Sequence, residues 1–594
     1  MWTSRWREEI WTKLQTDQHQ QDARWDVLVI GGGITGAGIL REATRLGLRT
    51  LLVERKDFAW GTSSRSSKLV HGGLRYLRNL QFRLTRNSVR ERERLLEEGP
   101  GLIDPMGFLL ATYKGDRPSG RVFEAGLTVY DLLALRWSHQ QFDTHDFQLL
   151  APHIVTEGLQ GGFRYGDAQT DDARLVLRII REAVRAGGVA LNYAGVESLL
   201  RGADDDVDGV LLRDTSRPNG PSVQVRARVV ISAAGAWADE LRKQIGGKAR
   251  LRPLRGSHLI FPAWKLPVAQ AISFLHPRDQ RPVFIFPWEG ITLVGTTDVD
   301  HSASLEEEPR ISTAEYVYLM EAVNSQFASL NLTKADILAT FSGIRPVIDT
   351  GKTDPSKESR DHVRWDEKGL ITVTGGKLTT FRLVALDALE LAVQRLPNAA
   401  KIDRKQPVLD QVGIDLSDVP TLDEGTRQRL LGRYGADAEF LVAEARTGEL
   451  EPIPGTASLW AELRWAARAE GVVHLDDLLL RRVRLGLLTD TGGCSIMERI
   501  RDVIQPELGW DDTRWDSEVQ RYADLWHQSY STPEGAPNVI GAVIPAPHKS
   551  ASRPVSRVSR PYYIALLGVG LLASLVLILQ LNRRRSLGDT PSPS

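Results

Sequence analysis

Three closely spaced glycines form the first pattern in this sequence with a chemical use. Gly31, Gly33 and Gly36 follow the apolar run DVLVI at 26–30 and open a helical pattern. The first allows a tight turn, the second lets the backbone approach a pyrophosphate, and the third lets helix and strand pack closely. Glu54, which ends the next apolar run, is placed to bind ribose hydroxyls. We therefore predict a dinucleotide site with its phosphates at the start of the helix.

A second segment, GTSSRSSKLVHGGLRY at 61–76, narrows the choice of dinucleotide. The glycine pattern alone serves NAD and FAD equally well. A run of small hydroxyl residues and glycines can wrap a diphosphate, and it brings His71, Arg75 and Tyr76 towards an isoalloxazine ring. The segment thus favours FAD, although such a run is by itself also compatible with a flexible loop.

With these motifs the sequence resembles a known family, the FAD-dependent glycerol-3-phosphate dehydrogenases of the D-amino-acid-oxidase-like flavoprotein group. The resemblance extends from about residue 25 to residue 530. Seven motifs carry it in the order of the family: IGGGITGAG at 30–38, GTSSRSSKLVHGGLRYL at 61–77, TDDARL at 170–175, RGSH at 255–258, VGTTD at 294–298, SGIRP at 342–346 and GGKLTTFR at 375–382.

The resemblance implies oxidation of sn-glycerol 3-phosphate to dihydroxyacetone phosphate, with electrons passing from FAD to a membrane quinone. A phosphate dianion needs several cationic donors, and Arg75, Arg345 and Lys377 lie in three of the motifs. Tyr76 adds a polar contact. Arg345 has a second candidate role, which is to polarise the C2 oxygen.

Two histidines are candidates for the base that takes the hydroxyl proton while hydride moves to the flavin. His258 in RGSH is the first choice, and His71 is the second. Where the family usually has Thr in AAGAW, this chain has Ala234, so backbone contacts must replace that hydroxyl. The remaining predicted flavin contacts come from Thr62, Ser63, Ser64, Ser67, Lys68, Ala233, Gly235, Gly375 and Gly376.

The elements that must position these residues indicate an α/β fold with a Rossmann-like FAD-binding domain at 25–400. A strand–helix–strand unit starts this domain. Because the apolar strands at 229–237 and 369–376 return to it, the domain is predicted to be discontinuous. SHLIFPAW, PVFIFPWEG and ITLVGTTD predict an inserted substrate domain with a second, antiparallel sheet, at about 77–165 and 240–345.

After residue 400 the pattern becomes helical and charge-rich, which predicts an all-α C-terminal domain at 401–530. Glu462, Leu463, Trp465 and Ala466 open one amphipathic segment, and LDDLLLRRVRLGLL forms another. At the other end, residues 1–24 predict an N-terminal helix. Trp2, Trp6, Ile10 and Leu14 recur at helical spacing there, which favours packing on the body over contact with a bilayer surface.

The C-terminal end predicts a membrane anchor that lies outside the family resemblance. Residues 531–561 are rich in proline and read as a linker. The next 20, at 562–581, carry no charge and suffice for a transmembrane helix of about 30 Å. A basic tail follows at 582–594, and because arginines flank the span on both sides, its orientation stays open.

Composition argues against a nucleic-acid-binding, a disulfide-stabilised or a zinc-binding protein. Lys plus Arg and Asp plus Glu each total 75, so no net positive field attracts nucleic acid. The single cysteine, Cys494, forms no intramolecular disulfide, and no cluster has the ligand spacing of zinc sites, so no metal is predicted. We expect a catalytic body in the cytoplasm, tethered to a bacterial inner membrane. A homodimer is among the oligomeric states that the sequence allows.

Three alternatives remain open at this level. The same fold can serve a glycerol-3-phosphate oxidase that reduces O₂. An amine or amino-acid oxidase is disfavoured, since it would need one carboxylate clamp rather than three scattered cations. A flavin-binding scaffold without catalysis is disfavoured by His258, Arg345 and Lys377.

Overall fold

The computed structural model describes most of the first 538 of 594 residues. Within this part of the chain, no helix is both long and apolar enough to span a bilayer. The predicted span at 562–581, the tail and most of the linker lie outside the described residues. The described ranges are 2, 5–18, 20, 23–74, 77, 81–116, 120–352, 358, 361–397 and 399–538.

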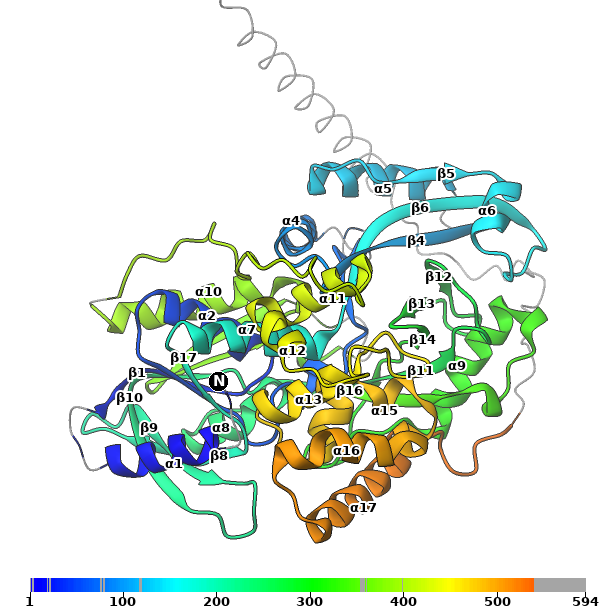
Figure 1. The fold of residues 1–594 in the computed structure, drawn as a ribbon. Helices are drawn as coiled ribbons and strands as arrows, with labels where there is room; N and C mark the ends of the chain where they lie inside the picture. Colours follow the sequence, from blue (N-terminus) through cyan, green and yellow to red (C-terminus); the bar gives the residue numbers. More distant parts are fainter. Residues whose placement is uncertain are drawn as a thin grey trace, which may run out of the picture.

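The first sheet has eight strands and contains the predicted strand–helix–strand unit (Figure 1). Its main order is β17-β18-β10-β1-β2-β7, and β9 and β8 extend from β10. The pairs from β18 through to β7 are parallel. The strands are β1 (Trp25–Ile30), β2 (Thr50–Val53), β7 (Val189–Leu191), β8 (Ala194–Arg201), β9 (Val207–Asp214), β10 (Ser222–Ser232), β17 (His362–Glu367) and β18 (Leu370–Gly375). The prediction of a discontinuous cofactor domain is consistent with this order, because β1 lies between β2 and the much later β10.

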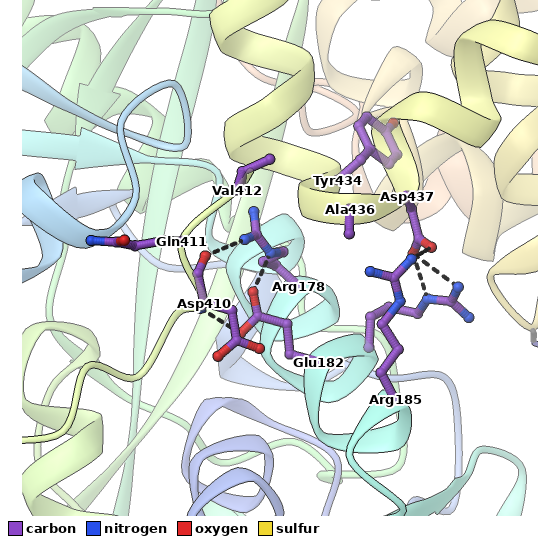
Figure 2. Close-up of a pocket in the computed structure, with 10 residues that line it drawn as sticks. Arg178, Glu182, Arg185, Asp410, Gln411, Val412, Tyr434, Ala436 and Asp437 are labelled. Atoms are coloured by element: carbon purple, nitrogen blue, oxygen red, sulfur yellow. Dashed lines mark hydrogen bonds and ion pairs between the residues drawn. The ribbon is translucent and has the colours of Figure 1, made fainter. Parts of the chain in front are cut away.

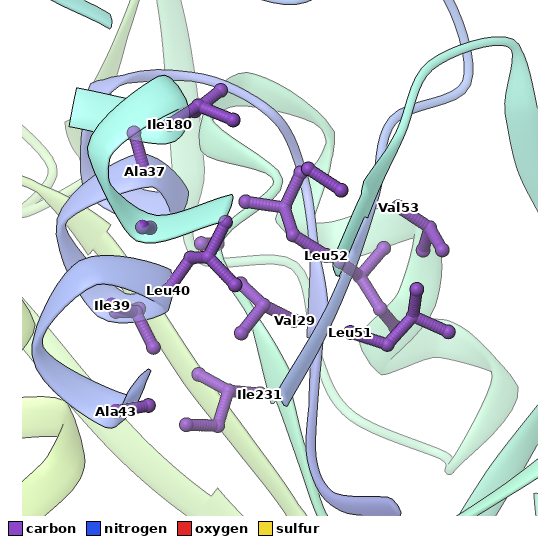
Figure 3. Close-up of a cluster of buried hydrophobic side chains, with 14 of the residues drawn as sticks. Val29, Ala37, Ile39, Leu40, Ala43, Leu51, Leu52, Val53, Ile180 and Ile231 are labelled. Atoms are coloured by element: carbon purple, nitrogen blue, oxygen red, sulfur yellow. The ribbon is translucent and has the colours of Figure 1, made fainter. Parts of the chain in front are cut away.

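Helices α2 (Ile34–Arg45), α7 (Asp172–Arg185) and α10 (Phe381–Ala392) cover this sheet. Figure 3 shows Val29 and Ile231 of neighbouring strands beside Leu40 of α2. All three side chains are fully buried. Burying one such side chain stabilises the fold by about 1.5–3 kcal/mol. The residues of β1 and β2 are buried on both faces of the sheet almost throughout, which explains why their sequences are nearly unbroken apolar runs.

The second sheet has ten strands and is antiparallel, as predicted, except where β4 pairs with β12. Its strands are β3 (Leu69–Val70), β4 (Ile103–Tyr113), β5 (Gln140–Phe142), β6 (Leu159–Thr170), β11 (Leu251–Pro262), β12 (Ala271–Leu275), β13 (Pro282–Trp288), β14 (Ile291–Gly295), β15 (Val299–Asp300) and β16 (Ala339–Ile348). The helices of this domain are α4 (Phe82–Glu98), α5 (Gly120–Ala134), α6 (Thr144–Leu150) and α9 (Thr313–Gln326), whereas α8 (Ala238–Gln244) contacts β8 and β18 of the first sheet. In the register of β11 with β16, His258 pairs with Phe341 and Leu254 with Arg345, so both predicted catalytic side chains belong to neighbouring strands.

The C-terminal region is helical, as predicted, and packs on the second sheet (Figure 1). Its helices are α11 (Glu424–Tyr434), α12 (Ala438–Ala443), α13 (Trp460–Ala469), α14 (Leu475–Asp477), α15 (Leu485–Leu488), α16 (Met497–Leu508) and α17 (Asp512–Ser529). A π-helical turn, Leu478–Arg482, separates α14 from α15.

The prediction of an amphipathic segment at 475–488 is wrong, because every residue in it is buried. Its arginines are at most 1% exposed, so the segment has no solvated face. Arg481 and Arg482 bind the buried carboxylate of Asp57, which follows β2 in the FAD-binding domain. Arg484 has a left-handed backbone with φ of 65° and is the N-cap residue that precedes α15. The polar face points inward because matching carboxylates are already buried there.

Both ends of the described chain pack on the body. The N-terminal helix α1 (Trp6–Asp17) buries Trp6, Trp11 and Leu14 in the core of the first domain, while Ile10 is partly buried, so the predicted packing is confirmed. At the other end, residues 530–538 run along the domain of the second sheet and form what we call the C-terminal strap. The Lys334 N–H donates to the Asn538 carbonyl at 2.8 Å, and the first residues of the predicted linker are thus packed.

Candidate functional site

One cavity of about 350 Å³ brings together most of the predicted site residues. It lies where the glycine turn after β1, the segment at 61–71, the ends of β10 and β18, and strand β16 meet. The lining residues that the sequence predicted are Gly31, Gly33, Glu54, Thr62, Ser63, Ser67, His71, Ala233, Gly235, Arg345, Gly375, Gly376 and Lys377.

Four predicted residues are described but do not line this cavity: Gly36, Ser64, Lys68 and His258. Gly36 lies within α2, Ser64 and Lys68 are buried, and His258 reaches the cavity wall only through a hydrogen bond. Arg75 and Tyr76 lie outside the described residues.

The glycine turn is as tight as predicted. Gly31 has φ of +114°, and a Cβ there would lie 2.6 Å from the carbonyl oxygen of Ala233. A Cβ on Gly36 would lie 1.9 Å from the carbonyl oxygen of Gly31, so only glycine allows α2 to start this close to the strand. The Ile34 N–H at the start of α2 donates to Ser63 Oγ at 2.9 Å. The segment at 61–67 is therefore fastened to the helix terminus that would face a diphosphate.

Glu54 is held by backbone donors at the end of β2. Its carboxylate accepts hydrogen bonds from the N–H groups of Gly32 at 2.7 Å and Lys56 at 3.0 Å. Burial raises the pKa of this carboxyl. The group lines the cavity, so ribose hydroxyls bound there would add donors to a carboxylate that burial has deprived of water.

Unpartnered polar atoms support the fit of a large polar cofactor. Trp237 Nε1 and Arg55 Nη2 are buried without a hydrogen-bond partner in the described structure, and both residues line the cavity. The ring of Trp60 lies 5.6 Å from that of Trp237 and lines the same wall. Trp60 was not predicted, although a tryptophan among small residues was a visible signal. A nucleotide with acceptors and a flat ring suits these walls.

Two cations, Arg345 and Lys377, are among the residues that line the cavity. Arg345 pairs with Asp298 at 3.0 Å and also donates to the Thr297 carbonyl oxygen at 3.1 Å. These bonds fix the guanidinium while leaving the residue in the cavity wall. Lys377 also lines the wall, with Nζ 3.2 Å from Ser88 Oγ. Two cations that line one cavity suit an anionic ligand.

His258 is buried and neutral. Burial, assisted by the charges of Arg345 and Lys68, holds its pKa well below the usual range of histidine. Its ring stacks on Phe341 with centroids 4.4 Å apart, and Nε2 lies 2.9 Å from Ser67 Oγ. Nδ1 has no partner among the described residues. A neutral imidazole can accept a proton, and Ser67 connects it to the cavity.

His71, the second histidine candidate, lines the cavity directly. Its backbone N–H donates to Thr379 Oγ1, and its carbonyl accepts from the same hydroxyl, each at 3.1 Å. The segment at 61–71 is thereby tied to the turn that follows β18. The geometry brings both histidines to one site.

A second cavity, of about 60 Å³, lies between α7 and the C-terminal domain (Figure 2). Arg178 is bonded to Glu182 and to the Gly432 carbonyl oxygen, and Arg185 faces Asp437. The cavity is small and its arginines already have acids or carbonyls as partners. It is therefore part of a charged domain interface.

The comparisons with known proteins agree with this geometry. Residues 26–391 match the family described as FAD dependent oxidoreductase, and residues 399–515 match the C-terminal domain of alpha-glycerophosphate oxidase. The chain is 35% identical over 540 residues to glycerol-3-phosphate dehydrogenase 2 of Mycobacterium tuberculosis, covering 87% of this chain and 89% of that protein. It is 34% identical over 503 residues to the aerobic glycerol-3-phosphate dehydrogenase of Staphylococcus aureus, covering 80% and 88%.

Among solved structures, the chain is similar to glycerol-3-phosphate dehydrogenase from Bacillus halodurans complexed with FAD. The TM-score is 0.71 at 28% identity, and the match covers 89% of this chain and 98% of that one. The glycine turn and the cavity lie within the first matched range, and helices α11 to α16 lie within the second. This chain belongs to the FAD-dependent glycerol-3-phosphate dehydrogenase family.

Proposed function

We propose that this chain oxidises sn-glycerol 3-phosphate to dihydroxyacetone phosphate. The observation that carries the proposal is a single cavity that extends from the glycine turn of a dinucleotide site to Arg345 and Lys377. Bound FAD would supply the hydride acceptor at its ring nitrogen. Gly31, Glu54 and Gly375 would hold the cofactor along the cavity. The similar proteins of M. tuberculosis and S. aureus are both named glycerol-3-phosphate dehydrogenases.

Phosphate binding falls to the cations of the cavity wall. Arg345 is pre-oriented by Asp298, so it loses little side-chain freedom when an anion arrives. Lys377 adds a second positive charge from the turn after β18. We keep Arg75 and Tyr76, from the same motif as His71, as proposed substrate contacts. Arg345 is also proposed to stabilise charge on the C2 oxygen.

Proton removal is assigned to His258 acting through Ser67. The Ser67 hydroxyl lines the cavity and lies 2.9 Å from Nε2, so it can pass the C2 hydroxyl proton to the imidazole. Because burial holds the pKa of His258 well below its usual range, the imidazole is unprotonated at neutral pH, as a proton acceptor must be. His71, which lines the cavity itself, is the alternative base.

Membrane quinone is the electron acceptor that we propose. The uncharged segment at 562–581 would tether the body to a bacterial inner membrane, next to a lipid-soluble acceptor, with the body in the cytoplasm. A second candidate is oxygen. The match of residues 399–515 to the C-terminal domain of alpha-glycerophosphate oxidase favours that reading, in which the product is hydrogen peroxide.

Anaerobic mixing tests the proposal. Purified holoenzyme is mixed with sn-glycerol 3-phosphate without oxygen, and the visible absorbance of flavin is followed. We expect bleaching with this substrate, and none with glycerol, which lacks the phosphate that Arg345 and Lys377 would bind. Unchanged flavin absorbance with glycerol 3-phosphate would contradict the proposal. Reoxidation of the bleached enzyme by a quinone analogue and by oxygen, compared in rate, separates the two acceptors.

A further inference from the structure

The motif TDDARL contributes a buried carboxylate that shapes the flavin loop. Asp172, the first residue of α7, is fully buried. It accepts hydrogen bonds from the Ser66 N–H at 2.9 Å and the Ser66 hydroxyl at 2.8 Å. Lys68 Nζ lies 3.0 Å from the same carboxylate. Residues 64–68, which we call the flavin loop, are thus wrapped around one side chain that lies outside the cavity.

An arginine from the C-terminal domain binds the other side of this cluster. Arg484 is 1% exposed, and its Nη2 donates to the Ser64 carbonyl oxygen at 3.0 Å and to Asp172. Its Nη1 donates to the Leu480 carbonyl oxygen at 2.6 Å, and Nε lies 3.3 Å from Asp171. One guanidinium therefore joins two domains and touches the backbone of the flavin loop itself.

Of the two cations that bind Asp172, Arg484 is the one whose charge does not depend on pH. Burial, together with the charge of Arg484, lowers the pKa of Lys68 to about 8. A guanidinium stays charged in proteins and offers its donors in a fixed fork. Lys replacing Arg484 would keep a positive charge but could not reach the Ser64 carbonyl, Asp172 and the Leu480 carbonyl in the same geometry.

The flavin loop leads directly to the proposed base. Ser67 follows Ser66, and its hydroxyl is the group that lies 2.9 Å from His258. Lys68 Nζ lies 4.8 Å from the centroid of Phe341, the ring on which His258 stacks. A shift of the loop by a fraction of an ångström would change both contacts.

We propose that Arg484 is a positioning residue: through Asp172 and the Ser64 carbonyl, the C-terminal domain holds the flavin loop in the shape that seats FAD and sets Ser67 against His258. The effect on the contact between Ser67 and His258 rests on the proposed function. The effect on FAD binding does not depend on which substrate the enzyme oxidises.

Arg484→Lys tests the inference, with Arg464→Lys as the matched control. Arg464 is also buried in the same domain, at 3% exposed, and is also paired with two carboxylates, those of Glu449 and Glu507, but it contacts no residue of the flavin loop. Both variants are prepared as full-length holoenzymes. Three quantities are compared: the rate of FAD release on dilution, the limiting rate of flavin reduction, and the dissociation constant of glycerol 3-phosphate.

For Arg484→Lys we expect FAD release to accelerate about 10-fold, the factor that the loss of 1.4 kcal/mol produces. The limiting rate of flavin reduction falls about 10- to 100-fold, because a displaced loop misaligns the reacting groups. Substrate affinity stays within about 2-fold, since Arg345 and Lys377 are untouched. Arg464→Lys lowers thermal stability without changing the three quantities.

Ser66→Ala serves as a second variant that leaves the buried charges paired, so it tests the inference if Arg484→Lys does not fold. It removes the hydroxyl bond to Asp172, and its effects should have the same direction. If FAD release and flavin reduction match the wild type in the folded variants, while stability falls as in Arg464→Lys, the inference is overturned. A wild-type enzyme that is not bleached by glycerol 3-phosphate contradicts the proposed function only, because FAD release is measured without substrate.

Discussion

At the scale of single residues, the site places a neutral histidine among charged groups. His258 is surrounded by Arg345, Lys68 and the ring of Phe341. Two nearby positive charges and burial all favour the neutral imidazole. Ser67 is its contact with the cavity. If His258 is the base and Ser67 its proton relay, as proposed, removing either one should slow the same step.

Substitutions at this pair provide the prediction for the residue scale. His258→Gln is expected to slow flavin reduction by about 10²- to 10⁴-fold and Ser67→Ala by somewhat less, since general bases contribute in this range. The limiting rate is measured by anaerobic stopped flow with saturating glycerol 3-phosphate. His71→Gln is the control variant and should retain most of the rate. If His71→Gln is slow and His258→Gln is not, His71 is the base.

The pH dependence of the wild type gives an additional check at this scale. The pKa of His258 is held well below 6.5, so protonation of this group should not slow flavin reduction between pH 8 and the usual pKa of histidine. The expected loss begins only at more acidic pH.

Sequence patterns predicted the residues of the glycine turn because their role is local. Gly31 and Gly36 need only each other and one neighbouring strand to explain their type. Within GTSSRSSK the pattern could not separate Ser67, which lines the cavity, from Ser64 and Lys68, which lie behind it. That difference depends on Asp172, which is distant in sequence.

At the scale of elements, the turn after β18 depends on the edge strand β17. His362 pairs with Gly375 in the register, and a Cβ on Gly376 would lie 3.3 Å from the Cβ of His362. Hydrogen bonds to Asp361 and Asp387 raise the pKa of His362 to about 9. A cationic histidine thus supports a glycine pair that lines the cofactor cavity.

This raised pKa predicts how stability changes with pH. Because the folded pKa of His362 exceeds the unfolded value of 6.5, its contribution is fully present below pH 6.5 and is lost as pH rises through about 9. His362→Gln should therefore lower the melting temperature at pH 6 but hardly at pH 10. Thermal unfolding of both proteins at the two pH values measures the difference. An equal decrease at both values would show that the charge of His362 is not the cause.

Apolar runs predicted the strands β1, β2, β10 and β18 of the first sheet and β11, β13 and β14 of the second, together with the helical C-terminal region, because apolar residues repeat wherever one face or both are buried. The prediction was wrong at 475–488. Arg481, Arg482 and Arg484 have the spacing of a solvated helix face, yet they are paired with buried carboxylates such as Asp57. A pattern of residue types shows where charged side chains occur along a helix. It does not show that carboxylates from another domain pair with them and bury them.

At the scale of the whole molecule, the C-terminal strap connects the end of the described chain to the flavin site. The Tyr530 hydroxyl donates to Glu308 at 2.6 Å. Arg65 of the flavin loop pairs with the same carboxylate. The Thr340 N–H of β16 donates to the Tyr530 carbonyl at 2.6 Å. The strap therefore belongs to the catalytic body.

Two truncations test this boundary. Ending the chain after residue 538 should preserve flavin reduction and release the enzyme from membranes, because the proposed anchor at 562–581 is removed while the strap stays. Ending it after residue 529 should lower the melting temperature, since several hydrogen bonds of about 1 kcal/mol each are lost. Membrane fractionation and thermal unfolding measure the two effects. Identical melting temperatures would show that the strap contributes nothing to the body.

The strand order also determines when the cofactor can bind during synthesis. The cavity needs β1 near the start of the chain, β10, and β18, whose last residue is Gly375. The flavin loop additionally contacts Arg484. A ribosome therefore releases most of the polypeptide before a complete FAD site exists. The nascent domain must remain soluble with an open nucleotide site until its own last strand arrives.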